Sequence, residues 1–193
     1  MTNFELGVRI PLVIRAPWLK TSVGRRSDAL AEIVDLYKTL SELAGIPVPT
    51  DNSHPVMGHS LVSAMAGGVH SSNYSFSQFA KTGKSVATAW GTCMGCHPSG
   101  HGAADYMGFT VRSAAWRWTE WVKYDKQAGA PVWSDGSVAQ ELYDHREDKG
   151  DGASFDDFEN ENLCNSTDAA ATAAIAELKV VLRSQFQHDG GDV

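Results

Sequence analysis

The densest group of potential metal ligands in the chain is the run Cys93-Met94-Gly95-Cys96-His97. Its spacing matches the Cys-x-x-Cys-His pattern of c-type haem attachment, in which two thiols form thioether bonds and the histidine is an axial ligand. In a second interpretation, Cys93, Cys96, and His97 or His101 bind zinc, with Cys164, another histidine or water as the fourth ligand. We favour a third interpretation, a Gly-rich loop in which Cys93 and Cys96 are redox-active or paired with each other.

Two arginines, Arg112 and Arg117, are the next candidates for a binding role. The planar guanidinium group donates two parallel hydrogen bonds to a carboxylate or a sulfate. The sequence leaves two possibilities open for this pair: contact with an anionic ligand, or ion pairs with Glu120, Glu141 or Asp144 inside the same domain.

Tryptophans gather around the same region, and they raise the possibility of carbohydrate stacking. Burial preference favours a place for Trp116 and Trp118 in the core of a sheet instead. We expect His59, beside Gly58, to hydrogen-bond within a loop rather than to bind a metal. The acidic run 144–159 lacks the Asp-x-Asp-x-Asp-Gly pattern of calcium loops, so a solvated loop is the better interpretation.

The overall charge excludes some classes of partner. The net charge of −7 argues against a general nucleic-acid or anionic-membrane binder, because these proteins need a basic face. No run of 18 apolar residues is present, so we expect no membrane span. Residues 1–6 do not have the pattern of a signal peptide.

The first half of the chain predicts a strand followed by a helix. Residues 8–14 form an apolar, β-branched run in which Pro11 should lie at a sheet edge or at the start of the strand. Residues 28–44 carry apolar side chains at three- and four-residue steps, and Gly45 and Pro47 end this helix. Residues 47–60 should form a loop.

The second half predicts antiparallel strands and a final helix. We expect a strand at 74–79, a long loop at 80–104, a hairpin formed by 106–112 and 116–122, and a further strand at 139–144. After a loop at 144–165, a helix spans 168–187, with Thr167 as its N-cap.

Together these elements predict an α+β fold: a small antiparallel sheet with the C-terminal helix packed on it. The first 45 residues differ, because one strand and one helix cannot bury both of their apolar faces without a larger sheet. We therefore expect the chain to be a piece of a longer protein.

Several segments, in order, resemble the sulfatase family, and within it the iduronate-2-sulfatase-like branch. They cover most of the chain: 2–5 with 9–12, 33–40 with 43–49, 58–61, 76–79, 107–112 with 116–122, and 141–145 with 159–160 and 162–163. The resemblance implies that residues 1–70 are the end of the family's large, alkaline-phosphatase-like α/β catalytic domain. Residues 71–193 would be its C-terminal subdomain.

In that family, a cysteine or serine in the motif Cys/Ser-x-Pro/Ala-x-Arg becomes formylglycine and attacks a sulfate ester beside a calcium ion. None of the three cysteines of this chain is followed by the required arginine, and the family's calcium-binding Asp-Asp pair is missing. The resemblance therefore implies no catalytic residue and no cofactor in this chain, and we expect it to be inactive alone. Its partner would be the missing N-terminal sulfatase domain.

The resemblance also implies a substrate class and a compartment for the intact enzyme. The substrate would be a sulfated, uronate-containing polysaccharide, and by their place in the resemblance Arg112 and Arg117 could face the cleft and contact the uronic acid. A secretory, lysosomal or extracellular location is expected for the intact family, whereas the chain itself leaves the compartment unknown.

Overall fold

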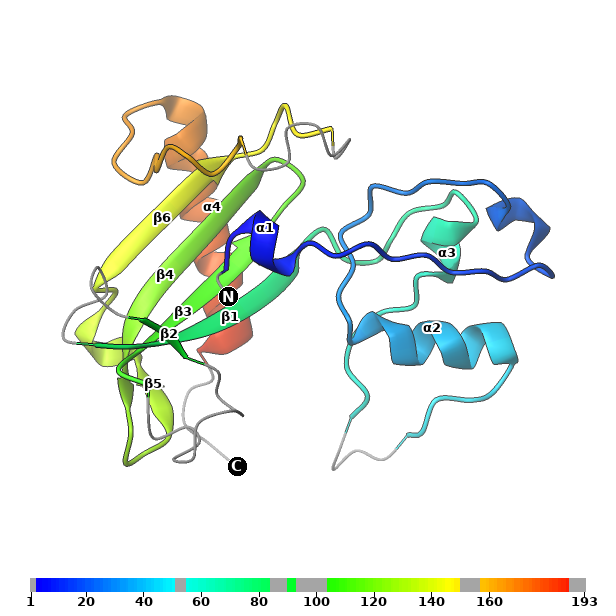
Figure 1. Ribbon diagram of the computed structural model, residues 1–193, viewed down its shortest axis with the longest axis horizontal. Coiled ribbons are helices and arrows are strands. Elements are labelled where there is room, and N and C mark those ends of the chain that lie inside the picture. The colour runs from blue at the N-terminus through cyan, green and yellow to red at the C-terminus, as the bar shows by residue number, and fades with distance from the viewer. Residues whose placement is uncertain (1–2, 51–54, 84–89, 93–103, 150–156, 188–193) are drawn as a thin grey trace. The chain divides into compact units, whose positions relative to one another are not determined.

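The structure is a computed structural model that describes residues 3–50, 55–83, 90–92, 104–149 and 157–187 (Figure 1). The chain divides into two compact units. One comprises Ile10–Ser75, and in the other Met1–Arg9 joins Phe76–Val193. The change of unit near residue 75 lies close to the expected boundary at 70, but the first nine residues group with the C-terminal unit. The assignment of residues 1–70 to the end of a catalytic domain stays a prediction.

The larger unit is built on a six-stranded sheet. Its strands are β1 (Ser75–Thr82), β2 (Trp90–Thr92), β3 (Tyr106–Arg112), β4 (Trp116–Asp125), β5 (Ala130–Val132) and β6 (Ala139–Asp144). The order is β2-β1-β3-β4-β5, and β6 also pairs with β4. The β3–β4, β4–β5, β4–β6 and β1–β2 pairs are antiparallel. The predicted hairpin and the strand at 139–144 are confirmed, whereas β5 was not predicted.

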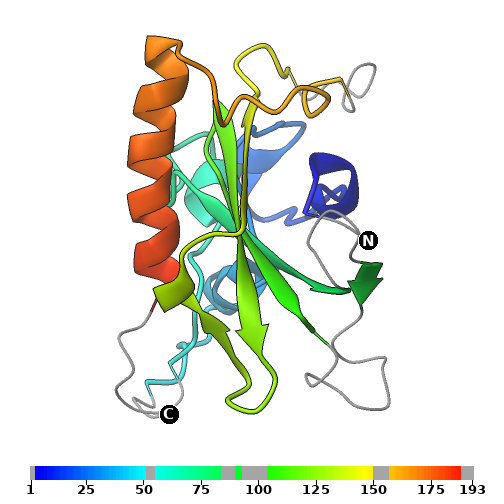
Figure 2. The same ribbon diagram turned by 90° about the vertical axis from the view of Figure 1, so that its left-hand side faces the viewer.

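The two faces of this sheet have different coverings, because side chains alternate along each strand. On one face, Phe109 of β3 contacts Phe186 of helix α4 (Ala169–Phe186), with ring centroids 4.6 Å apart. Figure 2 shows α4 along this face and the short helix α1 (Glu5–Val8) on the other side of the strands. Val111, Trp118 and Leu142 belong to the α4 face and are fully buried, so the expected sheet core is confirmed.

Helix α4 forms where its sequence predicts it. Its buried positions recur at three- and four-residue steps: Ala171, Ala174, Leu178 and Leu182. Asp168 is the N-cap, since its side chain accepts hydrogen bonds from the backbone N–H groups of Ala170 and Ala171, both at 3.0 Å. The prediction of Thr167 as the cap is wrong by one residue, because the helix starts one residue later than expected.

The smaller unit contains α2 (Asp35–Ala44), α3 (Val62–Met65) and the 3₁₀ turn η1 (Lys20–Ser22); a second such turn, η3 (Trp133–Asp135), belongs to the larger unit. Helix α2 begins seven residues later than the predicted start at 28 and ends at Gly45, whose φ of 65° closes the helix as expected. None of the described helices combines the length and the apolar character that a bilayer crossing requires.

The predicted strand at 8–14 is wrong. Val8 ends α1, and residues 9–14 are extended chain without strand pairing in the part that the structure describes. Ile10, Leu12 and Val13 of this run face solvent, with Val13 90% exposed. The reason is physical: a strand needs a neighbouring strand to accept its hydrogen bonds, and the described residues offer none here. The predicted loop at 80–104 also contains the end of β1 and the short strand β2.

The cap of α4 gives a direct test. We expect Asp168→Ala to lower the free energy of unfolding of the larger unit by about 1 kcal/mol, because two N–H groups lose their acceptor. Thr167→Ala is the matched control, since Thr167 is exposed and precedes the cap. Equal effects of the two substitutions in a urea titration would contradict this assignment of the cap.

Candidate functional site: a buried ionic network beneath the N-terminal segment

The register of the β3–β4 hairpin places two cations side by side. Arg112 and Arg117 are directly paired across the strands, and only 6% and 2% of their surfaces are exposed. They lie on the face opposite α4, next to Thr110 and Thr119, whose hydroxyls are 2.7 Å apart. Like charges at directly opposed positions repel each other and lose hydration when they are buried. This pair therefore requires carboxylates from elsewhere in the unit.

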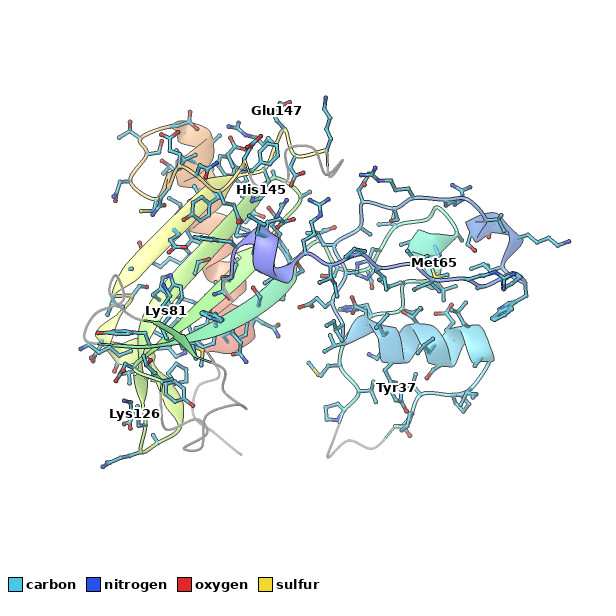
Figure 3. All side chains as sticks on the ribbon, in the orientation of Figure 1. Tyr37, Met65, Lys81, Lys126, His145 and Glu147 are labelled. Carbon is cyan, nitrogen blue, oxygen red and sulfur yellow. The ribbon has the colours of Figure 1, made fainter. Side chains whose placement is uncertain are left out.

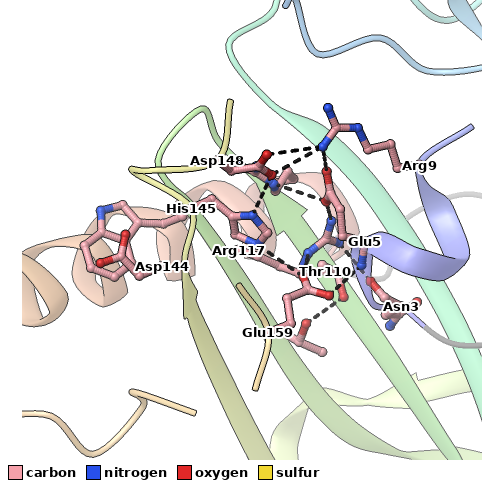
Figure 4. A network of polar contacts seen from close by, with 12 residues as sticks. Asn3, Glu5, Arg9, Thr110, Arg117, Asp144, His145, Asp148 and Glu159 are labelled. Atoms are coloured by element: carbon pink, nitrogen blue, oxygen red, sulfur yellow. Dashed lines mark hydrogen bonds and ion pairs between the residues drawn. The ribbon is translucent and has the colours of Figure 1, made fainter. Parts of the chain in front are cut away.

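Glu5 of α1 supplies the first carboxylate (Figure 4). Its Oε2 accepts from Arg112 Nε at 3.3 Å and also binds Arg117 Nη2. A third arginine, Arg9 of the N-terminal segment, lies 3.4 Å from Glu5 Oε1. One buried carboxylate thus holds both cations of the hairpin from a position more than 100 residues away in the sequence.

The segment before α1 is fixed to the same hairpin through its backbone. Arg117 Nη1 donates to the carbonyl oxygen of Asn3 at 2.8 Å, and Asn3 Nδ2 donates to the carbonyl oxygen of Gly108 at 3.0 Å. Phe4 packs edge-on against Tyr143 of β6, with ring centroids 5.6 Å apart. Residues 3–9 therefore form a cover over this face of the sheet.

Glu159 supplies the second carboxylate, from the segment that precedes α4. Its Oε1 forms an ion pair with Arg117 Nε, although this contact does not follow the N–H direction of a hydrogen bond. Its Oε2 accepts from the backbone N–H of Glu5 at 2.6 Å. Glu159 therefore joins the hairpin to the first residue of α1.

His145 and Asp148 complete the network. His145 directly follows β6 and is 1% exposed; Figure 3 marks its position. Its Nδ1 lies 3.2 Å from Asp148 Oδ2, and its Nε2 lies 3.2 Å from Glu159 Oε1. Asp148 Oδ2 in turn lies 3.3 Å from Arg9 Nη1 and 3.6 Å from Arg112 Nη2.

The arginines balance the carboxylates of the network. Arg9, Arg112 and Arg117 face Glu5, Asp148 and Glu159, and each of these carboxylates forms an ion pair with at least one arginine. The two ring nitrogens of His145 face Asp148 and Glu159, so the imidazole lies between two acceptors of the network.

Burial and neighbouring charges act on these groups in opposite directions. Burial disfavours the ionised form of Glu5, but the charges of Arg117, Arg112 and His145 outweigh it and hold the pKa of the Glu5 carboxyl below its ordinary value. Burial also disfavours the charged form of the Arg112 guanidinium. It lowers the pKa of this group, although the charge of Glu5 acts in the opposite direction. Pairing with the arginines therefore favours the ionised form of Glu5 despite its burial.

Glu5, His145 and Glu159 also form a group whose ligand atoms lie within 4.8 Å of one another, which is close enough for a metal ion. The cationic group of Arg117 already binds both carboxylates of this group. A divalent ion at the same place would meet a buried positive charge, so this arrangement fits a structural ion network better than a metal centre.

The sequence predicted two of the network's cations but not their partners. Of the expected acids, Glu120 pairs with Arg183 of α4 at 2.8 Å, Glu141 accepts from Trp121 Nε1 at 3.0 Å, and Asp144 pairs with Arg146. Asp148, from the acidic run read as solvated loop, is instead buried within the network. Contact of Arg112 and Arg117 with a uronic acid stays a prediction. The haem or zinc interpretation of Cys93, Cys96 and His97 lies outside the described residues.

Comparison with known proteins gives one sequence match. No family model matches the chain. A sulfatase from Formosa agariphila is 31% identical over 64 residues, which are 33% of this chain and 12% of that protein. Part of this chain is distantly related to a sulfatase. A solved structure of a candidate sulfatase from Bacteroides thetaiotaomicron aligns with 80% of this chain and 25% of that chain, with a TM-score of 0.44 and 21% identity. The chain thus spans only a small part of each relative.

The network gives a prediction about stability. We expect Glu5→Gln to lower the free energy of unfolding of the larger unit by about 3–5 kcal/mol, because it removes the one carboxylate that both buried arginines of the hairpin share and leaves an excess buried positive charge. The matched control is Glu147→Gln in the exposed loop after His145, which should change the free energy by less than about 0.5 kcal/mol. Equal, small effects in guanidinium titrations would contradict the network's role.

The same carboxylate predicts a pH dependence. Its pKa is lower in the folded than in the unfolded chain, so its contribution is complete above the ordinary value of 4.5 and is lost as the pH falls through the folded-state pKa. We expect the difference in unfolding free energy between the wild type and Glu5→Gln to shrink as the pH drops below about 4.5. Thermal unfolding of both proteins at a series of pH values measures this difference in free energy. A difference that stays constant with pH would contradict the prediction.

Proposed function

We propose that this chain is the C-terminal part of a sulfatase, a sulfuric ester hydrolase of the iduronate-2-sulfatase type that acts on a sulfated, uronate-containing polysaccharide. In this proposal the chain's own role is structural. It holds the segment 3–9 in a fixed position on the sheet, at the border with the rest of the enzyme. The observation that carries the proposal is the match of 64 residues to the Formosa agariphila sulfatase.

The ionic network supports a positioning role. Three parts of the chain that are far apart in sequence, near residues 5, 115 and 150, meet at Glu5, Arg117 and Glu159. A buried network of this kind gives geometric definition at a cost in desolvation, so its value lies in fixing one arrangement of the segment. In an enzyme, a segment fixed in this way keeps neighbouring groups aligned to within the fraction of an ångström that catalysis requires.

The exposed apolar side chains of the smaller unit support the proposal that a further domain packs against it. Its exposed apolar side chains include Ile10, Leu12 and Val13 from the extended segment, Trp18 from the turn after it, and Ile33, Tyr37 and Leu40 from α2 and the turn before it. Figure 3 marks Tyr37 on this helix. Tyr37 and Leu40 are three residues apart on α2 and so lie on one face of the helix, and an exposed apolar face is characteristic of an interaction site. In the proposal, the N-terminal sulfatase domain covers these side chains.

Sulfate-ester cleavage requires an activated nucleophile and a cationic site for the sulfate. The chain lacks the formylglycine motif, so the proposal assigns the nucleophile and the calcium ion to the missing domain. In this proposal, Arg112 and Arg117 hold the N-terminal segment on the sheet. Because their guanidinium groups are engaged with carboxylates, the proposal assigns them to positioning before any contact with substrate.

A chimera tests the proposal. This chain replaces the region that it matches in the Formosa agariphila sulfatase, and hydrolysis of an aryl sulfate is measured. We expect the chimera to retain activity and the isolated chain to have none. Activity of the isolated chain, or a well-folded but inactive chimera, would contradict the proposal.

A substitution in the chimera separates the two roles of the arginines. If Arg117 positions the segment, Arg117→Gln lowers the melting temperature of the chimera. The folded enzyme then keeps the same KM for a sulfated uronate oligosaccharide. For a substrate role, the same substitution raises KM with little change in melting temperature. Lys126→Gln, at an exposed position of the same unit, is the control.

A further inference from the structure

Residues 10–14 have the extended backbone of a strand but no strand beside them (Figure 1). In the part of the chain that the structure describes, no main-chain hydrogen bond joins this segment to another. Its side chains are equally uncovered, since Ile10, Leu12 and Val13 are all exposed. The segment therefore presents both its backbone groups and its apolar side chains to its surroundings.

The composition of this segment is that of a strand with layers on both faces. Apart from Pro11, its residues are aliphatic, and most of them are β-branched. A continuous apolar run, without alternation of apolar and polar residues, is typical of strands that are buried on both sides. Pro11 cannot donate to a ladder, which places it at the start of a strand or at an edge. The segment thus has the chemistry of a strand, although the described residues supply no neighbour for it.

Both ends of the segment are held in place. Arg9, directly before it, pairs with Glu5 and Asp148. Ala16, two residues after it, is buried, and its carbonyl oxygen accepts from the backbone N–H of Leu19 at 2.9 Å. A segment that is held at both ends loses less conformational entropy when another strand pairs with it. The extended conformation is therefore prepared for pairing.

Helix α2 of the same unit has its polar side buried and its apolar side exposed. Its two buried residues are Asp35 and Thr39, whereas Tyr37 and Leu40 are 52% and 60% exposed. The polar side fastens α2 to the loop that follows it, since Asp35 Oδ1 accepts from the backbone N–H of His59 at 2.7 Å. A helix buries its apolar side against another layer in a stable fold. The described part of the smaller unit lacks that layer for α2, just as it lacks a neighbour for residues 10–14.

We propose that residues 10–14 add as a strand to a sheet edge of the N-terminal sulfatase domain, and that the apolar side of α2 packs on the same sheet. The identity of this partner rests on the proposed function: the chain spans 12% of the sulfatase that it matches, so most of that protein lies outside the match. The partner surface is an open sheet edge with unpaired N–H and C=O groups. Main-chain hydrogen bonds supply the affinity of such an addition, and the aliphatic side chains supply its register.

Hydrogen exchange of the backbone N–H groups of residues 12–15 tests the strand. In the isolated full chain at low micromolar concentration, we expect these groups to exchange as fast as those of the exposed residues 26–28. In the chimera, we expect exchange at least about 100-fold slower at every second N–H group or at all of them. Residues 26–28 are the internal control and should exchange equally fast in both proteins.

The outcomes separate this inference from the proposed function. An active chimera in which residues 12–15 still exchange fast would overturn the strand and leave the sulfatase proposal standing. A folded but inactive chimera with slow exchange would support the strand and contradict the sulfatase proposal. Slow exchange in the dilute isolated chain would overturn the inference, because the segment would then pair within its own chain. Protection of the isolated chain that grows with concentration would also overturn it, since a second copy would be the partner.

Substitutions on α2 test the helix layer. Tyr37→Ser and Leu40→Ser should leave the melting temperature of the isolated chain unchanged, because both side chains are exposed there. In the chimera, each should lower the melting temperature by about 4 °C or more, because a buried apolar contact is lost. Glu42→Ser, at another exposed position of α2, is the matched control. Equal effects of the three substitutions in the chimera would contradict the packing of α2 on the partner's sheet.

Discussion

The larger unit depends on one constraint: two buried arginines lie next to each other at the turn end of the β3–β4 hairpin. The hairpin register pairs Arg112 with Arg117, and both are buried. Such a pair is tolerated only if carboxylates neutralise it at close range. Glu5, Asp148 and Glu159 do so from three separate segments, and the chain must therefore fold back to bring them there. Residues 3–9 belong to this unit for that reason.

The opposite face of the same sheet is held mainly by apolar packing. Helix α4 buries Leu178 and Leu182 against the strands, and Phe186 contacts Phe109. One ion pair, between Arg183 and the fully buried Glu120, crosses this interface. The sheet thus separates two kinds of interaction. Apolar burial supplies most of the stabilisation on the α4 face, and charge pairing defines the position of the N-terminal segment on the other.

The sequence predicted the elements whose pattern is local. The hairpin, the strand at 139–144 and α4 follow from alternation and helical periodicity, and the α+β class follows from their order. The strand at 8–14 failed because strand formation depends on a neighbour that the sequence pattern does not reveal. The sequence predicted only the two arginines of the network. Arginines in a strand indicate that carboxylates must lie nearby, but these carboxylates come from 100 or more residues away or from loops. Glu5, His145 and Glu159 all fall in segments of the sulfatase resemblance, which was the available signal.

The central claim is that Glu5 and Arg117 stabilise the unit as a pair. A double-mutant cycle measures this directly, with Glu5→Gln, Arg117→Gln and the double variant unfolded in guanidinium at neutral pH. We expect the double variant to be more stable than the sum of the single effects by about 1–3 kcal/mol, since each single variant removes a charge partner of the other buried group. Additive effects within about 0.3 kcal/mol would contradict the account.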